Sequence, residues 1–79
     1  MSNLEKYKKA FTDSLSIDKK NFTEDIEYNS IPEWDSIGHM TLMSALEDEF
    51  KVSIETDDIV DFSSFKKGLE ILKKYKVQF

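Results

Sequence analysis

Cysteine is absent from the 79 residues of the chain. This absence excludes a disulfide framework, a metal site built on thiolates and a thiol nucleophile belonging to the protein, so packing alone must hold the fold. Long apolar runs are absent too. The opening stretch MSNLEKYKKAF lacks the continuous apolar segment of a signal peptide, and no stretch approaches the length of a membrane span. We therefore expect a cytoplasmic protein that does not insert into a membrane.

The small size of the chain limits what it can do alone. With 39% hydrophobic content it forms one domain, residues 1–79, and buries only roughly 60% of the surface that its unfolded chain exposes. So small a core leaves a marginal net stability and no room for a deep cavity enclosed on all sides. We therefore expect chemistry on any large molecule to take place on a partner protein.

Positive charge is nearly absent from the middle of the chain. The net charge is −5, yet residues 21–62 hold twelve acidic residues against one base, Lys51, whereas residues 1–20 and 63–79 hold five lysines each. An acidic segment of this size repels nucleic acid and anionic membranes and attracts basic protein surfaces at raised association rates. We expect no nucleic-acid partner. A set of merely solvated faces is the alternative interpretation.

Strand signals are weak throughout, whereas the spacing of apolar residues predicts helices. Residues 3–15 form one amphipathic stretch, whose apolar stripe consists of Leu4, Tyr7, Phe11 and Leu15. A second helix is predicted to run from an N-cap at Asp35 or Ser36 to Phe50. Its core stripe consists of Leu42, Met43, Leu46 and Phe50.

Two further helices are predicted after residue 55. A short one follows Thr56, with acidic residues complementing the dipole at its start and with Ile59 and Val60 turned inward. Ser63 or Ser64 caps a last helix, whose buried side is marked by Phe65, Leu69, Leu72 and Tyr75 or Lys76. Gly68 in its middle costs about 1 kcal/mol relative to alanine, so it indicates a close helix contact.

The segment between the first two predicted helices, residues 16–35, is a long connector. It contains the only proline, Pro32, and shows no sustained period. Connectors of this length are uncommon in small domains unless they are functional or are tied down by apolar anchors. The candidate anchors are Phe22, Ile26, Ile31 and Trp34. The predicted fold is therefore all-α, a small four-helix bundle with three longer helices, one short helix and a long first connector.

The stretch EWDSIGHM, residues 33–40, contains the only tryptophan, the only histidine and a serine beside an aspartate. These residue types suggest a serine hydrolase. On a helix that turns by about 100° per residue, however, His39 falls on the core stripe, which favours a packed, hydrogen-bonded histidine. A triad also needs an oriented base and an oxyanion hole, which three neighbours on one helical turn do not supply. We expect no catalytic residue here, and we expect Asp35 and Ser36 to begin the helix.

The opposite side of the same predicted helix carries Ile37 and Met40, with Glu47 and Asp48 further along. Two large apolar residues that face away from the core beside acidic residues are typical of a docking face. The alternative interpretation is that Ile37 packs beneath the long connector.

The segment Asp35-Ser36-Ile37, followed by MTLMSALEDEF and then SIETDDI, resembles the central part of acyl carrier proteins. The tripeptide matches the phosphopantetheine attachment motif of that family, Asp-Ser-Leu/Ile. The tripeptide alone is a weak signal. The similarity continues through the helix, the Ala45-Leu46-Glu47-Asp48-Glu49-Phe50 run, the short acidic helix and the last helix, so it spans most of the chain after residue 30.

The resemblance implies that a phosphopantetheinyl transferase moves 4'-phosphopantetheine from coenzyme A onto Ser36, at a helix start that favours an anion. Because the chain lacks cysteine, the thiol that holds an acyl, aminoacyl or hydroxyacyl group would come from this arm. The protein would be a monomer that catalyses nothing and binds no metal. Its partners would be an acyl- or aminoacyl-loading enzyme and downstream transferases with basic docking surfaces. The residues implied for partner recognition are Asp35, Ile37, Met40, Glu47 and Asp48.

The chain departs from the carriers of fatty acid synthesis at four positions near the motif. Trp34 replaces the small residue that is common before the motif aspartate. Gly38, His39 and Thr41 are uncharged at pH 7 on the first turns of the helix, where those carriers tend to have more acidic residues. These residues look more like stand-alone carriers of specialised pathways, such as those that decorate surface polysaccharides or build secondary metabolites.

Other functions stay open at this point. An aminoacyl or peptidyl carrier is the alternative class of carrier, and an unmodified acidic helical adaptor is the alternative to a carrier. A calcium sensor is disfavoured, because the acidic cluster of the short helix lacks the alternating ligands, central glycine and terminal glutamate of an EF-hand. That cluster consists of Asp57, Asp58 and Asp61.

Overall fold

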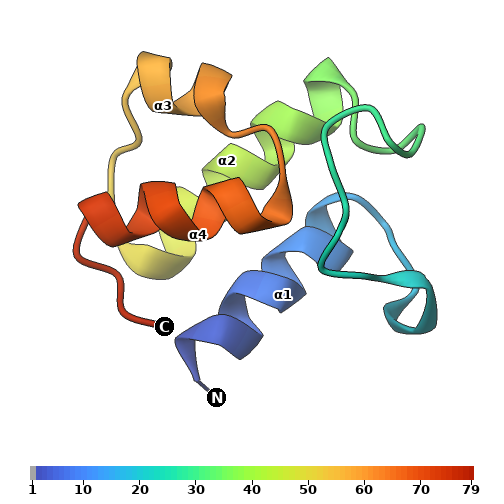
Figure 1. Ribbon diagram of the computed structural model, residues 1–79, viewed down its shortest axis with the longest axis horizontal. Coiled ribbons are helices and arrows are strands. Elements are labelled where there is room, and N and C mark those ends of the chain that lie inside the picture. Colours follow the sequence, from blue (N-terminus) through green and yellow to red (C-terminus); the bar gives the residue numbers. More distant parts are fainter. Residues whose placement is uncertain (1) are drawn as a thin grey trace.

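The computed structural model describes residues 2–79, and this part of the chain contains four α-helices and no strand. The helices are α1 (Asn3–Ser14), α2 (Ser36–Phe50), α3 (Thr56–Asp61) and α4 (Phe65–Lys74) (Figure 1). The connector contains one 3-10 turn, η1 (Lys19–Asn21), which the sequence pattern did not predict. The predicted all-α bundle of three longer helices, one short helix and a long first connector is confirmed.

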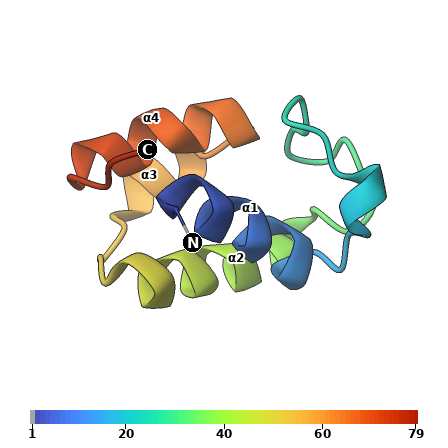
Figure 2. The ribbon, with the colours of Figure 1, turned by 90° about the horizontal axis from the view of Figure 1, so that it is seen from below.

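The helices form a bundle that the connector closes at one end. Figure 2 shows α2 on one side, α3 and α4 on the other, and the connector beside the start of α2. The two ends of the described chain meet, because the Asn3 amide donates to the Gln78 carbonyl over 2.9 Å. Within residues 2–79 no helix has the length and apolar character needed to cross a membrane.

Side-chain caps fix where α2 and α4 begin. The Asp35 carboxylate accepts from the backbone N–H of Gly38 over 2.8 Å, and the Ser64 hydroxyl accepts from that of Lys67 over 2.9 Å. A cap of this kind satisfies a donor that has no partner inside the helix and is worth about 1 kcal/mol. The caps decide between the alternatives left open by the sequence, in favour of Asp35 and Ser64.

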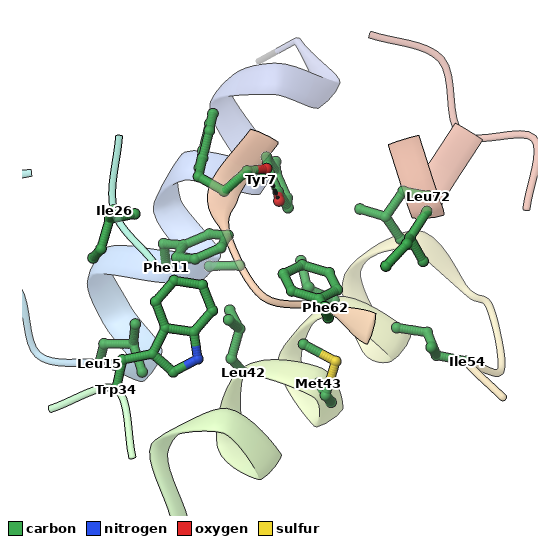
Figure 3. Packing of buried hydrophobic residues seen from close by; sticks show 14 of the residues in the cluster. Tyr7, Phe11, Leu15, Ile26, Trp34, Leu42, Met43, Ile54, Phe62 and Leu72 are labelled. Atoms are coloured by element: carbon green, nitrogen blue, oxygen red, sulfur yellow. Dashed lines mark hydrogen bonds between the residues drawn. The ribbon is translucent and has the colours of Figure 1, made fainter. Parts of the chain in front are cut away.

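The core lies between α1, α2 and α4 and is closed by aromatic residues (Figure 3). Trp34 is fully buried, and its indole packs edge-on against Phe11 with ring centres 5.2 Å apart. Burial of one large apolar side chain contributes about 1.5–3 kcal/mol, so Trp34 ties the end of the connector firmly to the core. The predicted anchors are confirmed. Ile26 is also buried, and Phe22 and Ile31 pack against the core while partly exposed.

Gly68 marks a close contact between helices, as predicted. A Cβ atom there would lie 2.1 Å from the Tyr7 hydroxyl oxygen and 2.2 Å from the Phe62 ring. Real Cβ atoms do not approach so closely, so any side chain would push α4 away from α1 and from the end of α3.

The predicted inward face of α3 is wrong at one position. Val60 is 76% exposed, and the residue of α3 that turns inward is Asp58, which is 7% exposed. The reason is that Asp58 finds hydrogen-bond donors at the end of α4, whereas a six-residue helix has too little surface to bury both apolar residues. In α4, Ile71 is buried and Leu69 is only half-buried. After its end, the C-cap Tyr75 is half-buried and Lys76 is exposed.

Candidate functional site

Ser36 is the first residue of α2, and its side chain is exposed. Two bonds hold the helix start in place: the Asp35 carboxylate accepts from Gly38 N–H, and the Asp35 carbonyl accepts from His39 N–H, both over 2.8 Å. The Ser36 hydroxyl is therefore presented at the surface from a helix start that cannot shift freely.

The connector passes directly beneath this helix start. A Cβ atom on Gly38 would lie 2.1 Å from the carbonyl oxygen of Glu33, a backbone atom that cannot move aside. Glycine is therefore needed at this position for the close approach, and the neighbouring Trp34 can enter the core. From the sequence, Gly38 could be described only as an uncharged neighbour of the motif, because the adjacent residues do not reveal that the Glu33 carbonyl lies against it.

His39 is 9% exposed and gives both ring nitrogens to partners other than Ser36. The Trp34 indole N–H donates to Nδ1 over 2.9 Å, and Nε2 lies 2.8 Å from the Ile59 carbonyl oxygen. An indole nitrogen only donates, so Nδ1 is the acceptor and Nε2 carries the hydrogen that is donated to Ile59. The prediction of a packed, hydrogen-bonded histidine is confirmed.

This arrangement does not provide a catalytic triad. His39 is held between Trp34 and Ile59, and the Asp35 carboxylate caps the helix, so neither is placed to accept the Ser36 proton. His39 and Asp35 therefore do not form the base and the orienting group that a serine triad requires. Among residues 2–79, no group of three or more histidine, aspartate and glutamate side chains is arranged to hold a metal ion.

The side chain that does reach Ser36 is Tyr28, from the connector. Its hydroxyl oxygen lies 3.1 Å from Ser36 Oγ. The same tyrosine lines a shallow pocket of 270 Å³ beside the helix start. The lining residues are Tyr28, His39, Ile59, Val60, Phe62 and Ser63. Sequence reasoning missed Tyr28, because it lies in the segment without a period and contacts a residue eight positions away.

The two apolar residues after Ser36 face solvent. Ile37 is 78% exposed and Met40 is 54% exposed. The alternative in which Ile37 packs beneath the connector is therefore wrong. With Ser36 and Asp35 also exposed, the start of α2 combines a hydroxyl, a carboxylate and an apolar surface that folding leaves uncovered.

The remaining predicted recognition residues lie further along α2. Glu47 is half-buried, and its carboxylate accepts from the Ile54 backbone N–H over 2.8 Å. Asp48 is exposed and borders the groove between α1 and α2. At a rise of about 1.5 Å per residue, Glu47 is about 16 Å along the helix from Ser36. The structure therefore groups Asp35, Ile37 and Met40 around Ser36 but not the later acids.

A second polar cluster joins α3 to the end of α4, and we call it the α3 clamp: Glu55, Asp58, Lys74 and Tyr75. The Lys74 ammonium donates to one oxygen of Asp58 over 2.5 Å and the Tyr75 hydroxyl to the other over 2.6 Å. These two bonds hold the pKa of Asp58 below its ordinary value, and the bond from Lys74 has the larger effect. The bond to Asp58 also raises the pKa of Lys74 and that of Tyr75.

The chain was also compared with known proteins. No known protein family matches it. No curated protein matches it either.

Proposed function

We propose that the protein is a carrier of the acyl carrier protein type, in which Ser36 bears 4'-phosphopantetheine from coenzyme A. The observation that carries this proposal is an exposed serine hydroxyl at the start of a 15-residue helix, within Asp35-Ser36-Ile37, while the neighbouring His39 and Asp35 are bonded to other groups. A hydroxyl placed in this way suits modification by a separate enzyme better than catalysis by the protein itself.

The residues at the helix start fit such a group. A phosphodiester on Ser36 would lie at a helix N-terminus, where backbone N–H groups and the helix dipole favour an anion. The exposed side chain leaves space for a long arm to extend away from the core. The arm would supply the thiol that the cysteine-free chain lacks, and that thiol would hold an acyl-type group as a thioester.

The surface around Ser36 supports the proposed partners. A phosphopantetheinyl transferase, a loading enzyme and downstream transferases would contact the exposed Ile37 and Met40, with Asp35 facing basic residues of the partner. Asp48 is exposed enough to join such a contact. One carboxylate oxygen of Glu47 already accepts a hydrogen bond from the Ile54 N–H, so the contribution of Glu47 to docking would be smaller than that of Asp48.

Modification in vitro tests the proposal. The protein is incubated with coenzyme A, Mg²⁺ and a transferase of broad specificity, and its intact mass is measured. We expect wild type to gain one phosphopantetheinyl group and Ser36→Ala, the matched control, to gain none. No gain in wild type, or an equal gain in Ser36→Ala, would refute the carrier proposal. An unmodified adaptor, which the exposed Ile37 and Met40 would also serve, would then be favoured.

We further propose that the carrier serves a specialised pathway, on the basis of Trp34, Gly38 and His39 beside the motif. Trp34 and His39 are bonded to each other in the core, and Gly38 lies against the Glu33 carbonyl. None of the three residue types carries the negative charge that would attract a basic docking surface. Loading by a purified malonyl transferase of fatty acid synthesis is the test. We expect it to be much less efficient than loading of a fatty acid carrier, and equal efficiency would contradict the proposal.

A further inference from the structure

Tyr28 is the one side chain outside the motif that contacts the proposed attachment oxygen through a hydrogen bond in the described structure, with 3.1 Å between its hydroxyl and Ser36 Oγ. We propose that Tyr28 is a positioning residue for Ser36: it holds the serine oxygen in one orientation before modification and donates a hydrogen bond to the modified group afterwards. This inference rests on the proposed carrier function. It assigns a role to the long connector, which the motif leaves without one.

The connector holds Tyr28 rigidly at both backbone and ring. The Tyr28 backbone N–H donates to the Ser63 carbonyl over 2.9 Å, which ties it to the loop before α4. Its ring packs edge-on against His39 with centres 5.3 Å apart and against Trp34 with centres 6.2 Å apart. His39 and Trp34 are themselves buried and hydrogen-bonded to each other. The partly exposed phenol is therefore supported by a backbone bond and by two buried rings.

Ser36 is supported from the other direction. Its backbone is fixed by the Asp35 cap and by the contact of Gly38 with the connector. What remains free is rotation about one side-chain torsion, which has three staggered positions. A hydrogen bond from a rigid phenol selects one of them. The Ser36 oxygen would therefore already be in a defined orientation when the transferase binds.

The chemistry of the modification gives this contact a direction. In the transfer, Ser36 Oγ forms a bond to phosphorus, the pyrophosphate bond of coenzyme A breaks, adenosine 3',5'-bisphosphate leaves with the bridging oxygen, and the serine proton passes to a base of the transferase. Before the reaction either hydroxyl can donate. Afterwards the serine oxygen carries no hydrogen, so Tyr28 is the donor, to the ester oxygen or to the phosphate. Phenylalanine cannot make that bond and has nearly the same shape.

The test compares Tyr28→Phe with Tyr75→Phe, which removes a tyrosine hydroxyl from the α3 clamp instead. Both are modified with the transferase under the conditions given above, after their folding is checked by circular dichroism. We expect kcat for Tyr28→Phe to fall about 3- to 10-fold with an unchanged KM, the loss of one exposed hydrogen bond. We expect Tyr75→Phe to match wild type. A raised KM with unchanged kcat would indicate docking and overturn the positioning role.

A spectroscopic measurement gives a readout that lost packing does not move. The ¹³Cζ resonance of Tyr28 is expected to shift in Ser36→Ala and again when wild type is modified, while the resonances of Tyr7 and Tyr75 stay in place. The ³¹P resonance of the modified protein is expected to differ in Tyr28→Phe but not in Tyr75→Phe. If wild type is modified, but none of these resonances shifts and Tyr28→Phe is modified with the kinetics of wild type, this inference alone is refuted. A wild type that is not modified would refute the carrier function, and this inference with it.

Discussion

Two tyrosine hydroxyls, those of Tyr28 and Tyr75, lie in polar clusters outside the buried core, and their surroundings differ. In the α3 clamp, the Tyr75 hydroxyl donates to Asp58 and accepts from the Glu55 N–H over 2.9 Å, while Lys74 takes the other Asp58 oxygen. At the start of α2, the Tyr28 hydroxyl meets a second hydroxyl, that of the exposed Ser36. The Tyr75 hydroxyl therefore both donates and accepts within the protein, whereas the Tyr28 hydroxyl makes one hydrogen bond in the described structure, to an exposed partner.

The difference separates a structural cluster from a candidate functional one. The clamp holds a six-residue helix that is too short to be stable alone, so its polar groups are committed to the fold. Buried side-chain nitrogen and oxygen atoms of residues 2–79 all have hydrogen-bond partners. Spare capacity therefore lies at the surface, and at Ser36 it coincides with exposed apolar residues. Each of the following predictions alters one of these two regions or its support, and the expected effects run from the largest to the smallest.

The largest loss of stability is expected at Trp34, the buried support of the Ser36 site. Trp34→Ala should lower the free energy of unfolding by about 3–5 kcal/mol, because a fully buried tryptophan leaves a large cavity. Trp34→Phe keeps a ring but leaves His39 Nδ1 without its donor, which should lower the free energy of unfolding by about 1–3 kcal/mol. Urea unfolding followed by circular dichroism measures both. A loss for Trp34→Phe as large as that for Trp34→Ala would show that the hydrogen bond, not packing, provides the support.

Asp58→Asn should reduce stability in a pH-dependent way and leave modification unchanged. Lys74 and Tyr75 hold the pKa of Asp58 below its ordinary 3.8, so the charged carboxylate stabilises the fold above that pH. This contribution is lost as the pH falls through the lower, folded-state pKa. We expect wild type to be the more stable protein at neutral pH, and the difference to shrink progressively below pH 3.8. Thermal unfolding of both proteins across this range measures it. A difference independent of pH would contradict the role of the charge.

The contrast also explains what the sequence could predict. The helices and their starts follow from apolar spacing and from caps such as Ser64, which act within three residues. Ser36 follows from a local motif. Tyr28 and Asp58 could not be predicted in the same way, because their partners lie 8 to 17 residues away. Asp58 had a local explanation, the helix dipole, and the tertiary contact with α4 took precedence over it.

Gly38 and Gly68 also show that a contact can be predicted only where the local sequence gives a sign of it. Gly68 interrupts a predicted helix, so its cost was visible and the close contact was predicted. Gly38 lies at a helix start, where glycine costs little, and the Glu33 carbonyl that requires it was not visible in the sequence.

The smallest effect is expected at Asp35, where structural and recognition roles overlap. Asp35→Ala removes the cap of α2 and should cost about 0.5–2 kcal/mol, whereas Asp35→Asn still caps the helix and should cost a few tenths. Ser64→Ala, which removes the cap of α4, is the matched control for stability. If the Asp35 charge guides a basic transferase, Asp35→Asn slows modification at low salt and the difference shrinks at high salt, while Ser64→Ala leaves the rate unchanged. Equal rates for wild type and Asp35→Asn at low salt would leave Asp35 with the cap as its only role.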